Sequence, residues 1–156
     1  AGVRLLSDST SILLETSTNT GTLANTGSFN LITGSNVSVT GYTSGSRGSA
    51  GMVSSSIAKS YTFVSPDNAV ITSTHDILAS LSTIRRNGIA GQNGTASKGT
   101  GNFGNYPLFI GRRAGTSLPF NGHLYSLISI GRLTTDAETI ALEKLIAKNT
   151  GVTLSV

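Results

Sequence analysis

The sequence contains no cysteine, so it forms neither disulfide bonds nor a thiolate-bound metal site. Its longest apolar runs are a few residues, far short of the ~20 residues that cross a bilayer as a helix. No basic segment followed by an apolar one marks a signal peptide. We therefore expect no membrane insertion, and the fold has to be held by its apolar core alone.

Charged side chains are also scarce, at 12% of the residues. Eleven Lys and Arg stand against seven Asp and Glu, a formal net charge of +4. The basic residues are scattered apart from the doublets Arg85-Arg86 and Arg112-Arg113, whereas a nucleic-acid-binding module concentrates them on one element. The sequence therefore predicts no nucleic-acid partner.

The chain of 156 residues is rich in Gly, Ser, Thr and Asn, and 37% of it is apolar. A disordered chain would carry more charge and fewer aliphatic side chains. Short apolar runs separated by glycine and polar turns are typical of strands. With no internal repeat and no break in composition, the sequence predicts one all-β domain over residues 1–156.

Apolar and polar residues alternate along much of the chain, which is the pattern of half-buried strands. This alternation predicts strands at Gly2–Leu6, Ile12–Thr16, Ser28–Thr33, Asn36–Thr43, Met52–Ile57, Tyr61–Val64 and within Ala69–Leu81. Polar turns or loops are expected between them, notably at Gly45–Gly51 and at Pro66-Asp67-Asn68. After Thr83–Arg86, Asn87-Gly88 predicts a hairpin, because a type I′ turn needs two residues with positive φ.

Two further strands are predicted at Pro107–Arg113 and His123–Ile130. The second carries apolar residues on both faces, which predicts a central strand covered on both sides. Before them, Gly91–Gly104 is a long loop rich in Gly, Asn and Thr. We expect it on the surface, where binding residues often lie on a rigid sandwich.

The end of the chain changes from period two to helical spacing. Thr135 and Glu138 match the capping box, in which the side chain of each residue accepts a hydrogen bond from the backbone N–H of the other. Apolar residues then follow at helical spacing: Ile140, Ala141, Leu142, Leu145 and Ile146. With acids in the first turn, lysines near the last and Gly151 as a stop, the pattern predicts a helix of about fourteen residues.

The residue types needed for catalysis are poorly represented. Glycoside hydrolysis needs two carboxylates across the bond, but three of the seven acids fall in the predicted helix and no strand carries an acidic cluster. No Gly-x-Ser-x-Gly elbow precedes a helix. His75 and His123 are expected to be ordinary strand residues, and Asp67-Asn68 is the one compact candidate for calcium. We predict no enzyme activity, no metal site and no cofactor.

The last part of the sequence resembles a known family. Gly101–Arg113 (GNFGNYPLFIGRR), Leu118–Leu127 (LPFNGHLYSL), a capped helix and Thr150-Gly151-Val152 follow one another. This succession resembles the closing part of concanavalin A-like, or laminin-G-like, jelly-roll domains found at the C-termini of bacteriophage tail and other virion proteins. The resemblance implies an antiparallel β-sandwich with one short C-terminal helix.

The opening of the chain, residues 1–54, looks like interior strands of the same domain. This implies that the family's first strand or strands are missing. A separate chain, a neighbouring copy or a cleaved remainder would then occupy the open edge.

The resemblance implies two hypotheses for function, and the sequence leaves both open. In the first, the chain is a non-catalytic, lectin-like module on a phage tail or outer surface, extracellular when released, which binds a host-surface glycan. In the second, it is a structural virion component that packs against other virion subunits, the remainder of a longer chain or further copies of itself, and binds no sugar.

The candidate ligand-binding residues lie around the strand at Pro107–Arg113. They are Asn102, Asn105, Tyr106, Arg112 and Arg113. Tyr106 is expected to be exposed and to offer a stacking face, and the arginine forks suit a polar or acidic sugar. The competing interpretation of the arginines is a salt bridge or a carbonyl contact.

Overall fold

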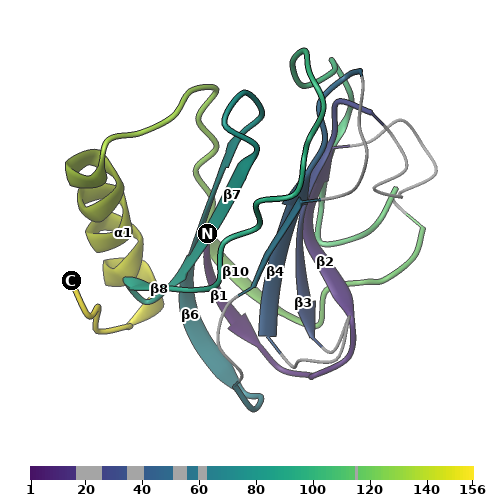
Figure 1. The fold of residues 1–156 in the computed structure, drawn as a ribbon. Helices are drawn as coiled ribbons and strands as arrows, with labels where there is room; N and C mark the ends of the chain where they lie inside the picture. The colour runs from purple at the N-terminus through teal and green to yellow at the C-terminus, as the bar shows by residue number, and fades with distance from the viewer. Residues whose placement is uncertain (17–25, 35–40, 51–55, 60–62, 115) are drawn as a thin grey trace.

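The computed structural model describes residues 1–16, 26–34, 41–50, 56–59, 63–114 and 116–156. These residues form ten strands, in two antiparallel five-stranded sheets, and one helix. The sheets lie face to face, and the helix covers the far side of one of them (Figure 1). The predicted all-β sandwich with a single C-terminal helix is confirmed.

We name the two sheets by their position relative to the helix. The helix-side sheet has the order β10 (Gly122–Ser126), β1 (Gly2–Leu5), β6 (Asp67–Asp76), β7 (Leu81–Arg86), β8 (Ile89–Ala90). The outer sheet has the order β5 (Ser56–Lys59), β4 (Gly41–Ser46), β3 (Phe29–Gly34), β2 (Ser11–Thr16), β9 (Leu108–Ile110). The helix is α1 (Asp136–Thr150). The first strand of the chain is therefore an inner strand of its sheet.

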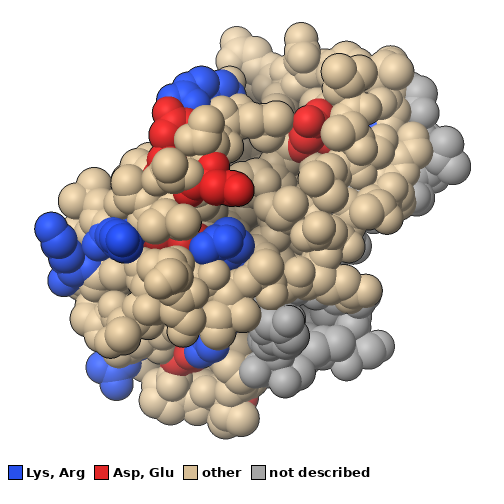
Figure 2. All heavy atoms as spheres, turned by 60° about the vertical axis from the view of Figure 1, so that its left-hand side comes forward, with Lys and Arg blue, Asp and Glu red and all other residues tan. Residues whose placement is uncertain are grey.

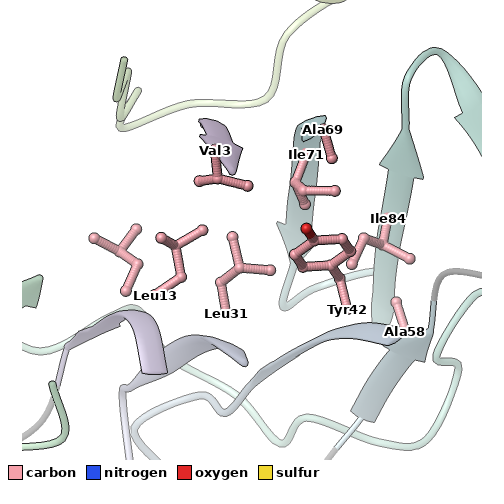
Figure 3. Packing of buried hydrophobic residues seen from close by; sticks show 9 residues of the cluster. Val3, Leu13, Leu31, Tyr42, Ala58, Ala69, Ile71 and Ile84 are labelled. Carbon is pink, nitrogen blue, oxygen red and sulfur yellow. The ribbon is translucent and has the colours of Figure 1, made fainter. Parts of the chain in front are cut away.

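The main core lies between the two sheets. Figure 3 shows Val3, Ala69 and Ile71 of the helix-side sheet pointing toward Leu13, Leu31 and Tyr42 of the outer sheet. All six side chains are almost fully buried, together with Leu14, Ala58 and Ile84 of the same cluster. Ala69 and Ile71 alternate along β6, because a strand places every second residue on one side.

A second, smaller core lies between the helix-side sheet and α1. Val70, Ile146 and Ala147 are buried there. The helix approaches closely because β1 presents a glycine: a Cβ atom on Gly2 would lie 2.7 Å from Cγ2 of Ile146. The helix-side sheet is thus covered on both faces.

The ends of α1 follow the sequence prediction. The Thr135 side chain accepts a hydrogen bond from the Glu138 backbone N–H, and the Glu138 carboxylate accepts one from the Thr135 backbone N–H at 2.9 Å. Gly151 ends the helix in the left-handed conformation, with φ of 67°. The predicted apolar face was only partly correct, because Leu145 is 54% exposed. The buried stripe is more polar than predicted and consists of Thr139, Glu143, Ile146, Ala147 and Thr150.

The buried acid on this stripe joins the helix to the sheet. Glu143 is 1% exposed and accepts two hydrogen bonds from the guanidinium of Arg85 on β7, at 2.8 and 3.1 Å. A paired fork of this kind is directional as well as strong. It therefore fixes how α1 sits across β6 and β7.

The hairpin prediction is confirmed, and two strand predictions are corrected. Asn87 and Gly88 have φ of 53° and 84°, and Arg86 pairs with Ile89 across the turn. The segment Ala69–Leu81 is interrupted by a turn at residues 77–80 that separates β6 from β7. The predicted central strand His123–Ile130 was wrong: β10 ends at Ser126 and lies at the edge of its sheet.

Other strand boundaries shift by a few residues. β4 occupies Gly41–Ser46, so it enters the predicted loop Gly45–Gly51, and most of Asn36–Thr43 lies outside the described residues. Most of Met52–Ile57 and the first part of Tyr61–Val64 also lie outside them. Asp67 and Asn68, predicted as a turn, begin β6.

We expect Gly2→Ala to lower the free energy of unfolding by roughly 1–3 kcal/mol, because the added methyl group overpacks the contact between β1 and α1. Gly131→Ala is the matched control, since a Cβ atom there meets nothing within 4 Å. Denaturant unfolding of both variants measures the difference. Equal stabilities would show that α1 does not rest on β1 at this distance.

Candidate functional site

A groove of about 730 Å³ opens at one end of the sandwich. One wall is the outer sheet, through Leu14 and Leu31, and the other includes α1, through Leu142 and Ile146. β6 forms one edge of the groove and the segment 127–134, which links β10 to α1, forms the other. We call this space the inter-sheet groove.

The groove lies beside the part of β6 that extends past its pairing with β1. β1 begins at Gly2, opposite Val70, while β6 continues to Asp76. The helix and the outer sheet still cover both faces of the helix-side sheet at this level. The space beside the end of β6 is therefore walled on two sides with no described strand between the walls.

The rim of the groove carries one of the predicted ligand-binding residues. Asn102 is exposed and lines the groove together with Phe103, which is 40% exposed. Asn105 is exposed but does not line the groove. The prediction that Tyr106 is exposed was wrong: it is half-buried, and its ring covers the backbone of Gly104.

The two candidate arginines lie beyond the other end of β9. Arg112 is exposed, and Nε of Arg113 donates a hydrogen bond to the buried carboxylate of Glu15 at 3.2 Å. For Arg113 this agrees with the salt-bridge interpretation. Neither arginine lies within β9, so the predicted strand Pro107–Arg113 is shorter than expected. Because β9 separates them from Asn102 and Tyr106, the structure does not gather the five candidates into one site.

A buried polar chain lies at the far end of β6, next to the groove. His75 lines the groove, and its Nδ1 lies 2.9 Å from Oγ of Ser82. Its Nε2 lies 3.0 Å from Oγ of Ser44 on β4. Nζ of Lys98 in turn donates to Ser82 at 2.5 Å and to Ser46 at 2.9 Å. Lys98 and Ser82 are 0% exposed.

The donors and acceptors fix one direction for this chain. Ser44 donates its hydroxyl proton to the carbonyl oxygen of Asn30 at 2.8 Å, so it accepts from His75, whose Nε2 carries the proton. Nδ1 of His75 then accepts from Ser82, which accepts from Lys98. Burial, with the charge of Lys98 as a smaller cause, lowers the pKa of His75 to about 3, so the ring is neutral.

The serine, histidine and lysine resemble the parts of a nucleophilic site, but their burial opposes that role. A nucleophile has to reach its substrate, and Ser82 and Lys98 have no exposed surface. Sequence reasoning missed this chain because it treated Gly91–Gly104 as a surface loop. That prediction was wrong for Lys98, whose carbonyl oxygen also accepts from the Gly48 N–H at 2.8 Å.

The carboxylate of Asp67, which with Asn68 was the candidate for calcium binding, is bound by other side chains of the protein. The carboxylate of Asp67 is ion-paired with Arg86 and accepts a hydrogen bond from the hydroxyl of Tyr42 at 3.1 Å. Burial and the neighbouring Asp67 charge raise the pKa of Tyr42. Within the described residues, no three His, Asp or Glu side chains group as metal ligands. In the same part of the chain, no helix is long and apolar enough to cross a membrane.

No family model, no curated protein and no solved structure matches this chain. Most residues that line the inter-sheet groove lie outside Gly101–Arg113, the segment that contains the predicted ligand-binding residues.

We expect the protein to lose stability as the pH falls from 7 to 5. The pKa of His75 is lower in the folded state than its ordinary value of 6.5, so the unfolded chain takes up the proton first and stability falls below about pH 6.5. The loss from this residue is about 2 kcal/mol by pH 5. Denaturant unfolding of His75→Gln, which lacks this proton uptake, should show a correspondingly smaller loss.

Raising the pH should have the opposite effect through Lys98. Burial, partly offset by Asp76, lowers the pKa of Lys98 to about 8. The folded state therefore gives up its proton before the unfolded state does, and stability rises by about 2 kcal/mol from pH 7 to 10. Comparison with Lys98→Met isolates this contribution, and parallel pH profiles for the two proteins would contradict it. Above about pH 10, the raised pKa of Tyr42 opposes the gain.

Proposed function

We propose that this domain is a non-catalytic docking module that holds a segment of another polypeptide in the inter-sheet groove. The observation that carries the proposal is the groove itself. It is a space of about 730 Å³ between the outer sheet and α1, with a lining that is more apolar than polar. Concave sites with apolar walls and a few polar groups are the usual binding sites of proteins.

The composition of the groove supports a polypeptide ligand. Its walls present aliphatic side chains of β2, β3 and α1, and its edge presents hydroxyl groups of β6, such as Thr72 and Ser73. At its mouth, Ile128 and Ile130 are 38% and 41% exposed. Exposed apolar side chains beside a groove mark surfaces that a partner covers.

The distribution of charge also supports a protein partner. Arg85, Arg86 and Arg113 are all committed to ion pairs with acids of this chain. In Figure 2, Lys, Arg, Asp and Glu side chains cover a minor part of the face shown, and most of it is uncharged. Such a surface suits docking onto protein better than steering toward a phosphate backbone.

The setting of this function comes from the sequence resemblance. On that basis, we propose that the sandwich is of the concanavalin A-like jelly-roll type and that the module belongs to a phage virion. The docked segment would then come from another virion subunit. This is the structural hypothesis of the sequence analysis, with the groove as its contact site.

A second candidate function is glycan binding at the rim of the groove. The exposed amide of Asn102 lies next to the partly exposed ring of Phe103, whose centroid is 5.6 Å from that of Phe29 in an edge-to-face contact. An aromatic face beside a hydrogen-bonding amide suits a sugar ring. Of this pair, Asn102 belongs to the ligand-binding residues predicted from the sequence, and Phe103 does not.

A parallel screen of a random hexapeptide library and a glycan array against the immobilised domain tests the proposal. We expect peptides with alternating apolar residues to bind, and Ser73→Trp to weaken them at least tenfold, because the indole would fill the groove. Leu145→Trp, on the exposed side of α1, is the matched control and should bind as the wild type does.

The outcomes of this screen separate the two functions. Glycans that bind the wild type and are lost in Asn102→Ala would favour the lectin-like function. Peptide binding that survives Ser73→Trp unchanged, or no peptide binding at all, would reject the docking function. Circular dichroism of each variant checks that the sandwich is intact.

A further inference from the structure

We infer that the outer sheet carries an anion-binding site in which Asn30 and Arg47 hold a carboxylate group. This site goes beyond the proposed docking function, because it lies on the face of the outer sheet that points away from the helix-side sheet (Figure 1). The inference depends on two buried N–H donors without an acceptor among the described residues and on one positive charge without a counter-charge.

The register of β3 and β4 places the two side chains on the same face. Asn30 points away from the sandwich, because its neighbour Leu31 points into it (Figure 3). Gly45 lies directly opposite Asn30 on β4, and Arg47 follows two residues later. The ladder continues to Arg47, whose N–H donates to the carbonyl oxygen of Ser28 at 2.8 Å. Arg47 is therefore the diagonal neighbour of Asn30, a position from which a long side chain reaches across.

The first donor without an acceptor is the amide nitrogen of Asn30. Oδ1 of Asn30 accepts a hydrogen bond from the Gly45 N–H at 3.2 Å, which fixes the orientation of the amide group. Nδ2 is then left without a hydrogen bond, although the residue is 2% exposed. Burying an N–H group without an acceptor costs free energy, so this nitrogen needs a partner that the protein does not supply.

The second donor without an acceptor is Nε of Arg47. The residue is half-buried, and Nε itself is buried without a hydrogen bond. All seven acids of the chain lie within the described residues, and none forms an ion pair with Arg47. Burial therefore lowers the pKa of Arg47, with no carboxylate to offset the effect. An anion at the guanidinium would remove this cost.

The charge and the space at the site favour a carboxylate. Glu15, the neighbour of Asn30 on β2, is paired with Arg113, so it leaves the charge of Arg47 uncompensated. A monoanion balances that charge, whereas the dianion sulfate would leave an excess negative charge. The flat edge of a guanidinium also matches the two oxygens of a carboxylate. Gly45 places no side chain between the two donors, so the ligand has room over its backbone.

The test uses acetate as the probe, titrated into the ¹⁵N-labelled domain at about pH 7, where acetate is ionised. Chloride keeps the ionic strength constant. We expect the Nε–H signal of Arg47 and the side-chain amide signals of Asn30 to shift together and to saturate in the millimolar range. Sulfate at the same ionic strength should bind roughly tenfold more weakly, because of its second charge.

Two variants and a matched control separate this site from general attraction of anions to basic residues. Arg47→Met removes both the donor and the charge, so acetate should no longer shift the Asn30 signals. Arg47→Lys keeps the charge without the flat edge and should bind acetate roughly tenfold more weakly. Arg112→Met removes an exposed arginine that also lacks an ion-pair partner, and it should bind as the wild type does. Circular dichroism checks that each variant is folded.

Three results would overturn the inference. Shifts that do not saturate, or that are equal at Arg112 and Arg47, would reveal an adventitious ion only. A saturable shift at Arg47 without one at Asn30 would show that the two side chains do not share a ligand. Sulfate that binds as tightly as acetate would reject the carboxylate. The peptide screen is independent of all three, so the docking function stands or fails separately.

Discussion

The helix-side sheet is covered on both faces, and this double cover governs both its sequence and its shape. β1 directs Val3 into the sandwich and Gly2 toward α1, where a methyl group already would crowd Ile146. β1 therefore lies between α1 on one side and the outer sheet on the other, and these two elements form walls with space for a single strand between them. Where β1 is absent between them, the walls remain, and the gap between them is the inter-sheet groove.

Pairing with β7 as far as Asp76, together with the buried polar chain, holds β6 extended after its pairing with β1 has ended. His75 is bonded to Ser44 of the outer sheet and to Ser82 of β7, so the end of β6 is tied in two directions. The ring is neutral, and the hydroxyl groups of Ser44 and Ser82 each donate one hydrogen bond and accept one, which is the condition for burying such groups at low cost. The groove is thus preformed, with a rigid edge.

The sequence predicted the strands, the hairpin and the helix better than it predicted which strands lie next to each other in a sheet. Period-two alternation and the capping box are local signals, so the sandwich, the Asn87-Gly88 hairpin and the ends of α1 could be predicted. Sheet order is non-local: nothing in the alternation of residues 123–130 indicates whether the strand is central or at an edge. The apolar residues on both faces of this segment do not mark a central strand. Those after Ser126, such as Leu127 and Ile128, line the inter-sheet groove.

The candidate site could be predicted far less well than the fold. Residues were selected by chemistry within one segment, around Tyr106 and Arg113, whereas the groove is assembled from β2, β3, β6, α1 and the link after β10. Lys98 shows the same limit, since a lysine in a Gly-rich loop reads as solvent-exposed and is here 0% exposed. Burial of this kind is set by loop contacts that are distant in sequence.

The spacing of backbone hydrogen-bonding groups along β6 distinguishes a polypeptide from a sugar as the ligand of the groove. Ile71 forms a mutual backbone pair with Ala1, and backbone groups alternate in direction along a strand. Ser73 and His75 therefore direct their N–H and C=O groups to the same side, about 7 Å apart along β6, and Leu14, Leu31 and Leu142 line the walls. A sugar ring has hydroxyl groups around its whole edge, so it would bury several of them against Leu14, Leu31 and Leu142 without partners, at a cost for each. An extended strand matches both features at once, because its backbone groups lie in the plane of the sheet and its side chains point to the walls.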